Sequence, residues 1–233
     1  MTDAPQKALV LCSGGLDSTT LLALMIERYG RENVEALRID YGQKHARELQ
    51  ASEAVANHYG VPLHTLDLTE VFAESDCSLL AHSDGEIPHE SYGEQTARMD
   101  GAPVSTYVPF RNGLFLSAAS SMALSLSCDL LCYGAHGDDA AGSAYPDCSQ
   151  EFVDAMARAI ELGTGGMLRM EAPFVRLTKA NIVAEGLRLG VPYGITWSCY
   201  EGGDTPCGAC ATCIDRARAF AANSAIDPAL EGE

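Results

Sequence analysis

The sequence predicts an α/β protein built on a doubly wound, mainly parallel sheet. Short apolar runs alternate with segments of helical periodicity through the first third of the chain, and Gly30 and Gly60 close the first two predicted helices. Strands that alternate with helices form parallel βαβ units, because each helix returns the chain to the same end of the sheet. With 233 residues, the chain is long enough for one main domain and a small appendage.

The first third contains three predicted strands. The first is an apolar run at 7–12, and it leads through a glycine-rich loop into leucines at helical spacing. The second strand is predicted at Val34–Ile39 and is followed by a helix from about His45 to Tyr59. The third strand is predicted at Val61–Leu68. These elements give the first two βαβ units.

The later part of the chain is less regular. Residues 69–108 show no sustained period of either kind, which is typical of a functional loop or lid. Beyond them we expect a small-residue helix at Gly113–Ser127 and a buried strand at Leu130–Tyr133. Two further helices are predicted at Glu151–Leu162 and Thr178–Leu189.

Composition limits the partners and the location. The 32 acidic residues outnumber the 15 Lys and Arg, giving a formal net charge of −17 that repels a polyanion. We therefore expect no nucleic-acid partner. Because no apolar run is long enough to cross a bilayer and the first seven residues carry no export signal, we also expect no membrane association and a cytoplasmic location.

A phosphate-binding loop is predicted at Ser13-Gly14-Gly15-Leu16-Asp17-Ser18, between the first strand and the first helix. Free backbone N–H groups and the positive helix end favour an anion there. The loop lacks the spacing and the lysine of a Walker A motif. An aspartate beside phosphates requires a cation between them, so Asp17 is a candidate ligand of Mg²⁺. The alternative is a tight turn in which Ser13 or Ser18 caps the helix.

A metal site is predicted near the C-terminus, where Cys199, Cys207, Cys210 and Cys213 have the spacing C-x7-C-x2-C-x2-C. Four thiolates suit Zn²⁺ in a closed, structural site. An iron–sulfur cluster is the rival interpretation. We expect a main domain at 1–190 and a helical, zinc-binding lobe at 191–233 that does not fold independently. The other cysteines lie mostly in apolar surroundings and are predicted to be small core residues; they are Cys12, Cys77, Cys128, Cys132 and Cys148.

Several short strings together indicate a family. The phosphate loop resembles the SGGxDS loop of the N-type ATP pyrophosphatases, and with the cysteine motif and five further strings the chain resembles the 7-cyano-7-deazaguanine synthases, or QueC family, from about Ala8 to Phe220. The five strings are Asp40-Tyr41-Gly42-Gln43-Lys44-His45, Val108-Pro109-Phe110-Arg111-Asn112, Tyr145-Pro146-Asp147-Cys148, Glu171-Ala172-Pro173-Phe174 and Thr178-Lys179. Each string alone is a weak signal, but their order and spacing make the match specific.

The resemblance implies a Rossmann-like fold of the adenine nucleotide alpha hydrolase type and a ligase that forms carbon–nitrogen bonds. Its members use ATP twice, converting 7-carboxy-7-deazaguanine and ammonia first to an amide and then to 7-cyano-7-deazaguanine, in queuosine or related 7-deazapurine biosynthesis. Each step passes through an adenylated intermediate. The resemblance also suggests a homodimer, and free ammonia is the expected nitrogen source, because the chain has no room for a glutaminase domain.

The resemblance also suggests site residues. ATP is expected at 11–19, comprising Leu11, Cys12, Ser13, Gly14, Gly15, Leu16, Asp17, Ser18 and Thr19. Asp17, Lys44 and Arg111 are the candidate catalytic residues, and the two cations are expected near phosphate or the substrate carboxylate. Arg111, Asp139 and Asp147 are candidates for substrate binding, because a carboxylate matches the paired donors of a guanine-like edge.

Other assignments stay open at this point. A surface lysine and loop-solvated aspartates need no functional explanation. His136 is a candidate acid or base, and a structural histidine is equally consistent with the sequence; Lys179 is a further candidate phosphate contact. The alternative functions are an amide-forming deazapurine synthase, a tRNA-thiolating enzyme of the same superfamily, and a non-catalytic nucleotide sensor or zinc-stabilised interaction module.

Overall fold

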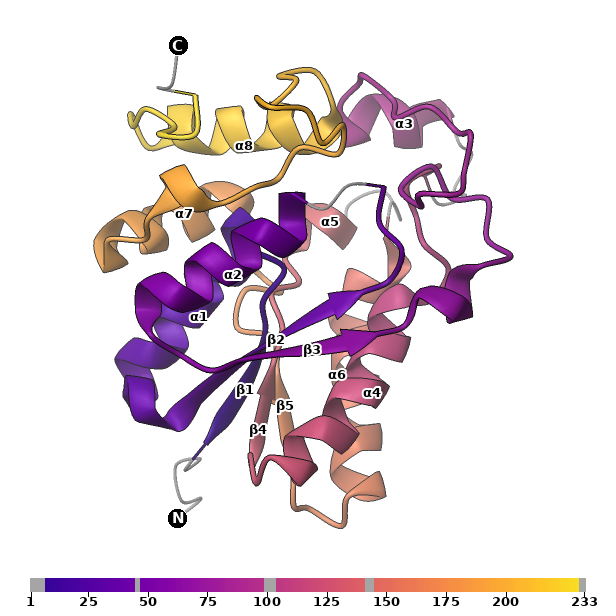
Figure 1. Ribbon diagram of the computed structural model, residues 1–233. Helices are drawn as coiled ribbons and strands as arrows, with labels where there is room; N and C mark the ends of the chain where they lie inside the picture. Colours follow the sequence, from indigo (N-terminus) through magenta and orange to yellow (C-terminus); the bar gives the residue numbers. More distant parts are fainter. Residues whose placement is uncertain (1–6, 45–46, 99–103, 141–144, 231–233) are drawn as a thin grey trace.

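The computed structural model describes residues 7–44, 47–98, 104–140 and 145–230, with only the backbone described at 139–140. Its centre is a five-stranded sheet in the order β3-β2-β1-β4-β5, and all four strand pairs are parallel (Figure 1). The predicted α/β class is confirmed. The strands are β1 (Ala8–Leu11), β2 (Val34–Asp40), β3 (Leu63–Asp67), β4 (Leu130–Cys132) and β5 (Arg169–Glu171).

Helices cover both faces of the sheet (Figure 1). They are α1 (Leu16–Tyr29), α2 (Arg47–Tyr59), α3 (Tyr92–Arg98), α4 (Arg111–Ser125), α5 (Gly137–Ala140), α6 (Gln150–Gly163), α7 (Lys179–Leu189) and α8 (Ala211–Ala222). The helix ends follow local chemistry. Thr178 and Asn181 form a reciprocal capping box at the start of α7, and Gly190 ends it in the left-handed conformation.

Alternation along β1 divides the core into two layers. Ala8 and Val10 belong to the cluster that includes apolar residues of α1, α2, α7 and α8, whereas Leu9 belongs to the cluster with α4 and α6. Successive strand residues point to opposite faces, so a fully apolar run supplies both layers. In the described part of the chain, no helix is both long and apolar enough to cross a membrane.

Three short elements were not predicted, namely β5, α3 and α5. The strand β5 has one buried residue, Met170, and so carries no apolar run, yet it pairs in register with β4. The stretch expected to be irregular contains the short helix α3 and packs into a third apolar cluster through Phe72 and Leu80. That cluster also contains three of the four motif cysteines, Cys199, Cys210 and Cys213. The segment therefore covers the cysteine region.

A buried ion pair holds the C-terminal region together. The guanidinium of Arg216 on α8 donates to both carboxylate oxygens of Asp227, over 2.6 and 2.8 Å. It also donates to Thr196 Oγ1 over 2.8 Å and to the carbonyl of Tyr193 over 3.0 Å. Both charged side chains are buried. This network joins α8 to the short 3-10 turn η5 (Tyr193–Ile195) that precedes the cysteine motif.

Candidate active site

A cavity of about 230 Å³ lies at the carboxyl ends of the central strands. Leu11 of β1, Ile39 of β2 and Tyr133 directly after β4 line its floor. The strand order reverses direction between β1 and β4, and in open α/β sheets ligands bind at this point, outside the carboxyl ends. The cavity therefore occupies the expected place for a ligand.

The predicted phosphate loop forms one wall of this cavity. Gly14 has a φ of +83°, and a Cβ there would lie 2.3 Å from the backbone nitrogen of Ser52 on α2, so only glycine fits. The N-cap residue of α1 is Gly15, which provides no side-chain cap. The first turn of α1 faces the cavity through Leu16, Asp17 and Ser18. An uncapped helix end at a cavity favours an anion. The capping alternative is not realised at this N-terminus.

Two cationic or titratable side chains approach Asp17. Lys179 Nζ at the start of α7 and His136 Nε2 after β4 lie 3.7 and 3.6 Å from Asp17 Oδ2. The other oxygen, Oδ1, is buried, and among the described residues no hydrogen-bond donor reaches it. A buried carboxylate oxygen without a donor is costly unless another ligand binds it. Asp17 can therefore hold a cation at the phosphate loop.

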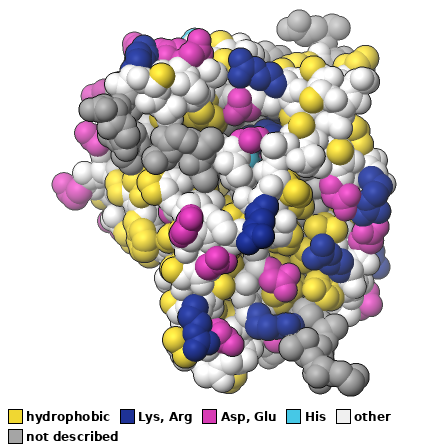
Figure 2. Space-filling view, turned by 180° about the vertical axis from the view of Figure 1, so that it is seen from behind, with side chains coloured by type: hydrophobic (Ala, Val, Ile, Leu, Met, Phe, Trp, Pro, Cys, Tyr) yellow, Lys and Arg dark blue, Asp and Glu magenta, His cyan; other side chains and the backbone are white. Residues whose placement is uncertain are grey.

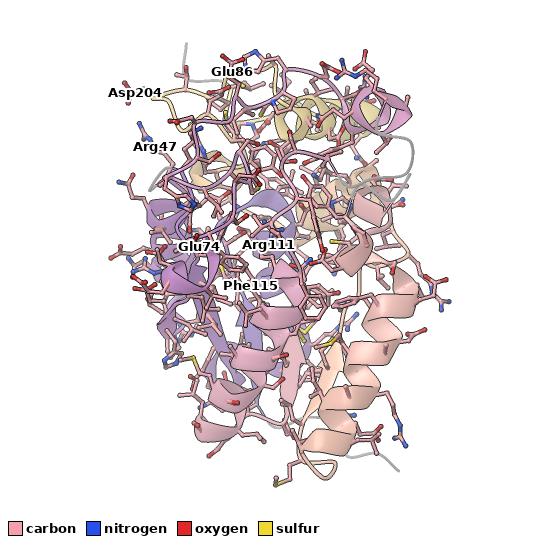
Figure 3. The ribbon with its side chains drawn as sticks, turned by 90° about the vertical axis from the view of Figure 1, so that its right-hand side faces the viewer. Arg47, Glu74, Glu86, Arg111, Phe115 and Asp204 are labelled. Carbon is pink, nitrogen blue, oxygen red and sulfur yellow. The ribbon has the colours of Figure 1, made fainter. Side chains whose placement is uncertain are left out.

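Arg111, the first residue of α4, provides a positive charge that also lines the cavity. Its guanidinium carbon lies 5.6 Å from the centre of the Tyr41 ring and 5.9 Å from that of Phe115. Figure 3 shows Arg111 and Phe115 at the same end of α4. Loss of water contact lowers the pKa of Arg111, but Tyr41, Tyr200 and Asp147 raise it overall, so the side chain stays charged.

The four motif cysteines come together as predicted. Their Sγ atoms all lie within 4.8 Å of one another, and no other such group occurs in the part of the chain that the structure describes. Tetrahedral Zn–S bonds require sulfur atoms about 3.8 Å apart, so this set fits a metal ion. Backbone N–H groups of residues 201 and 207 donate to Cys199 Sγ over 3.4 and 3.3 Å, and such donors favour thiolate sulfur.

The cysteine cluster is joined to the cavity. Trp197, Ser198, Tyr200 and Thr212 all line it. The backbone N–H of Trp197 donates to the carbonyl of Gly14 in the phosphate loop over 3.0 Å. Thr212 Oγ1 donates to the carbonyl of Ser198 over 2.7 Å. The residues beside the metal ligands therefore form part of the cavity wall.

Comparison with known proteins identifies the family. The model of the queuosine biosynthesis protein QueC matches residues 7–224. The chain belongs to the QueC family. A 7-cyano-7-deazaguanine synthase of Archaeoglobus fulgidus is 42% identical over 228 residues, which cover 97% of this chain and 91% of that protein. One of Marinobacter nauticus is 40% identical over 228 residues, covering 98% and 97%.

A solved structure is also similar to this QueC chain. It is the U34-tRNA thiolase NcsA of Methanococcus maripaludis with its 4Fe-4S cluster, at 16% identity and a TM-score of 0.49, covering 83% of this chain and 60% of that one.

On the face of the QueC chain seen in Figure 2, Lys and Arg side chains are scattered among acidic ones and form no continuous basic surface.

The cavity contains most, but not all, of the predicted ATP residues. Leu11, Cys12, Ser13, Gly15, Leu16, Asp17 and Ser18 line it. Gly14 and Thr19 lie behind this wall, where Gly14 packs against α2 and Thr19 is buried. The five cysteines outside the metal motif are all buried, as predicted.

Three other predicted site residues do not line the cavity or lie outside the described residues. Lys44 is exposed, donates from Nζ to the carbonyl of Gly85 over 2.8 Å and does not line the cavity. Asp147 is buried and accepts from the backbone N–H of Asn112 over 2.9 Å, at the start of α4 behind the cavity wall. The side chain of Asp139 is outside the described residues, as is His45. The roles predicted for Lys44, Asp139 and Asp147 stay predictions.

The structure adds cavity residues that the sequence did not indicate, chiefly Arg38, Glu48, Tyr133 and Tyr200. Glu48 lies in the first turn of α2. Loss of water contact raises its pKa to about 7, although Arg111 attracts its charged form and acts to lower the pKa. The sequence held a signal for Glu48, because this residue lies near the start of the helix that follows the carboxyl end of a parallel strand, where ligands bind.

Proposed function

We propose that the chain converts 7-carboxy-7-deazaguanine and ammonia to 7-cyano-7-deazaguanine with ATP, as the names of its relatives indicate. The observation that carries this proposal is the cavity, because both an uncapped helix end and Arg111 line it at the switch point of the sheet. The helix end suits phosphates, and Arg111 suits a carboxylate. That arrangement brings an acid oxygen toward a nucleotide.

The chemistry follows from activation of poor leaving groups. A carboxylate oxygen attacks the α-phosphorus of ATP, the new O–P bond forms and pyrophosphate leaves. Ammonia then attacks the acyl carbon, and the C–O bond to AMP breaks. In the second round the amide oxygen attacks another ATP, and loss of two protons and AMP gives the nitrile. The loop N–H groups orient the triphosphate tail, and Lys179 neutralises part of its charge.

Two metals belong to this proposal. Asp17 would hold Mg²⁺ at the phosphate loop, and its buried Oδ1 supports that role. Such an ion would supply charge neutralisation beside the phosphates. The four cysteines would hold Zn²⁺, because four thiolates suit its tetrahedral coordination. The role of this ion would be structural, because a closed set of four thiolates leaves no position for a substrate. Zinc in the purified protein, measured by elemental analysis, tests that choice against an iron–sulfur cluster.

The test incubates the protein with 7-carboxy-7-deazaguanine labelled with ¹⁸O in the carboxyl group, ammonium, Mg²⁺ and ATP. We expect AMP, pyrophosphate, a nitrile base and label in AMP, all read by mass spectrometry. ADP and phosphate in place of AMP and pyrophosphate would contradict the proposal, and accumulation of the amide alone would indicate an amide-forming synthase. Asp17→Asn should lose activity severely, whereas the exposed Asp154→Asn on α6 is the matched control.

We also propose that 191–233 is a lobe that depends on 1–190 for its fold. Tyr193 supports this through the 2.8 Å hydrogen bond between its hydroxyl and Thr20 Oγ1 of α1, and α8 packs against α7; expression of 191–233 alone should give an unfolded peptide by circular dichroism. A homodimer and a cytoplasmic location complete the proposal. Sedimentation velocity and cell fractionation test them.

A further inference from the structure

Two carboxylates line the cavity among the described residues, and they come from different helices, α1 and α2. Asp17 belongs to the phosphate loop and is approached by Lys179. Glu48 comes from α2 and lines the cavity together with Arg111 of α4, whose positive charge acts on it. Because the reacting carboxyl group of the substrate is expected at the Arg111 side, Glu48 is the carboxylate placed toward the chemistry.

The charged and titratable groups around Glu48 come from α4 and from β2 with the residue that follows it. Arg111 extends from α4, Tyr41 follows β2, and Arg38 of β2 donates to the carbonyl of Leu49 over 3.1 Å. No hydrogen bond or ion pair of the Glu48 carboxylate occurs among the described residues. A half-buried carboxylate that lines a cavity and has no fixed partner in the described part of the chain is available to a ligand.

We propose that Glu48 binds the ammonium ion in this cavity and accepts its proton, delivering ammonia to the activated carboxyl carbon. This inference rests on the proposed function. An anionic side chain attracts ammonium, which is the abundant form of this nucleophile near neutral pH, and only unprotonated nitrogen has the lone pair for attack. The Glu48 carboxylate can both attract the ammonium ion and remove its proton.

The step balances in protons and electrons. Ammonium gives one proton to the Glu48 carboxylate and becomes ammonia. Its lone pair forms the C–N bond, and the C–O bond to AMP breaks with its electron pair leaving on the phosphate. After the attack the nitrogen carries one proton more than the amide needs, and this proton leaves on the phosphate of AMP. Glu48 returns its proton to water after the product departs, which restores the carboxylate.

Other cavity groups are less suited to this proton transfer. Burial raises the pKa of the Cys12 thiol to about 11, and it raises the pKa of Tyr41 and of Tyr133 further still. These groups stay protonated near neutral pH. Burial also raises the pKa of Glu48, to about 7, and a carboxylate with a higher pKa is a stronger base.

The test compares ammonium with hydroxylamine as nucleophile in the wild-type protein and in Glu48→Gln. Hydroxylamine is far less basic than ammonia and is already unprotonated near neutral pH, so it bypasses the proposed step. With ammonium we expect kcat to fall about 100-fold or more, the typical loss for a general base. With hydroxylamine we expect kcat to stay within a few-fold of wild type, and the KM for 7-carboxy-7-deazaguanine to stay unchanged with both.

Controls separate this role from others. Transfer of carboxyl ¹⁸O into AMP should persist in Glu48→Gln, and Glu48→Asp should recover part of the ammonium-dependent rate. Glu53→Gln removes a carboxylate from the same helix outside the cavity and should match wild type. An equal loss with both nucleophiles, or no loss with either, would overturn the proposal. If the wild-type protein itself forms no AMP, the proposed function fails instead.

Discussion

Replacement of Glu48 by Gln is expected to stabilise the folded protein at alkaline pH. Loss of water contact raises the pKa of this side chain from 4.5 to about 7. When the folded-state pKa lies above the unfolded one, the stabilising contribution is complete below the unfolded pKa and is lost as pH rises through the folded pKa. One pKa unit corresponds to about 1.4 kcal/mol, so ionised Glu48 costs the folded state about 3 kcal/mol.

The assay measures urea unfolding at about pH 8 and about pH 4.5, on either side of this window. Glu48→Gln should be more stable than wild type by about 2 to 3 kcal/mol at the higher pH, after allowance for partial solvent contact, and by far less at the lower pH. Glu53→Gln should show no such difference. An advantage of equal size at both pH values would refute the reasoning, because the ionised carboxylate would not be its source.

Two other changes probe the C-terminal region. Arg216→Met should lower the free energy of unfolding by about 3 to 5 kcal/mol and the melting temperature by about 6 to 20 °C, because it leaves the buried Asp227 without its partner. Combining it with Asp227→Leu should recover much of the loss in a thermal scan, and an additive loss would contradict this account. Cys213→Ser, or a chelator, should weaken ATP binding measured by calorimetry, because the chain beside the metal ligands holds Gly14 through Trp197. Added zinc should restore the chelated protein, and unchanged affinity without metal would contradict the link.

Much of the sheet could be predicted because burial on both faces leaves a direct signal in the sequence. The strand β1 is apolar at every position, and Leu9 packs on the opposite face from Ala8 and Val10. The strand β5 gives no such signal, because Met170 is its only buried residue and its flanking residues are Arg169 and Glu171. Its pairing depends on β4, which lies far away in the sequence.

The site was predictable where the backbone itself carries the function. The glycine-rich loop and the cysteine spacing each fix a local geometry, and both lie where that geometry serves a ligand. Side-chain direction was not predictable in the same way. Lys44 follows a family-like string, but its ammonium group reaches the carbonyl of Gly85. Glu48 looks like an ordinary polar residue of a helix until α4 places Arg111 beside it.

The position of Glu48 connects stability with activity. A carboxylate that were fully solvated, or paired closely with Arg111, would have an ordinary or lowered pKa and would be a weak base near neutral pH. Burial raises the pKa of Glu48, and its carboxylate lines the cavity with no fixed partner among the residues that the structure describes. The same burial destabilises the folded chain whenever Glu48 is ionised. A Gln substitution should therefore separate the two properties, because the gain in stability and the loss of ammonia transfer arise from one charge.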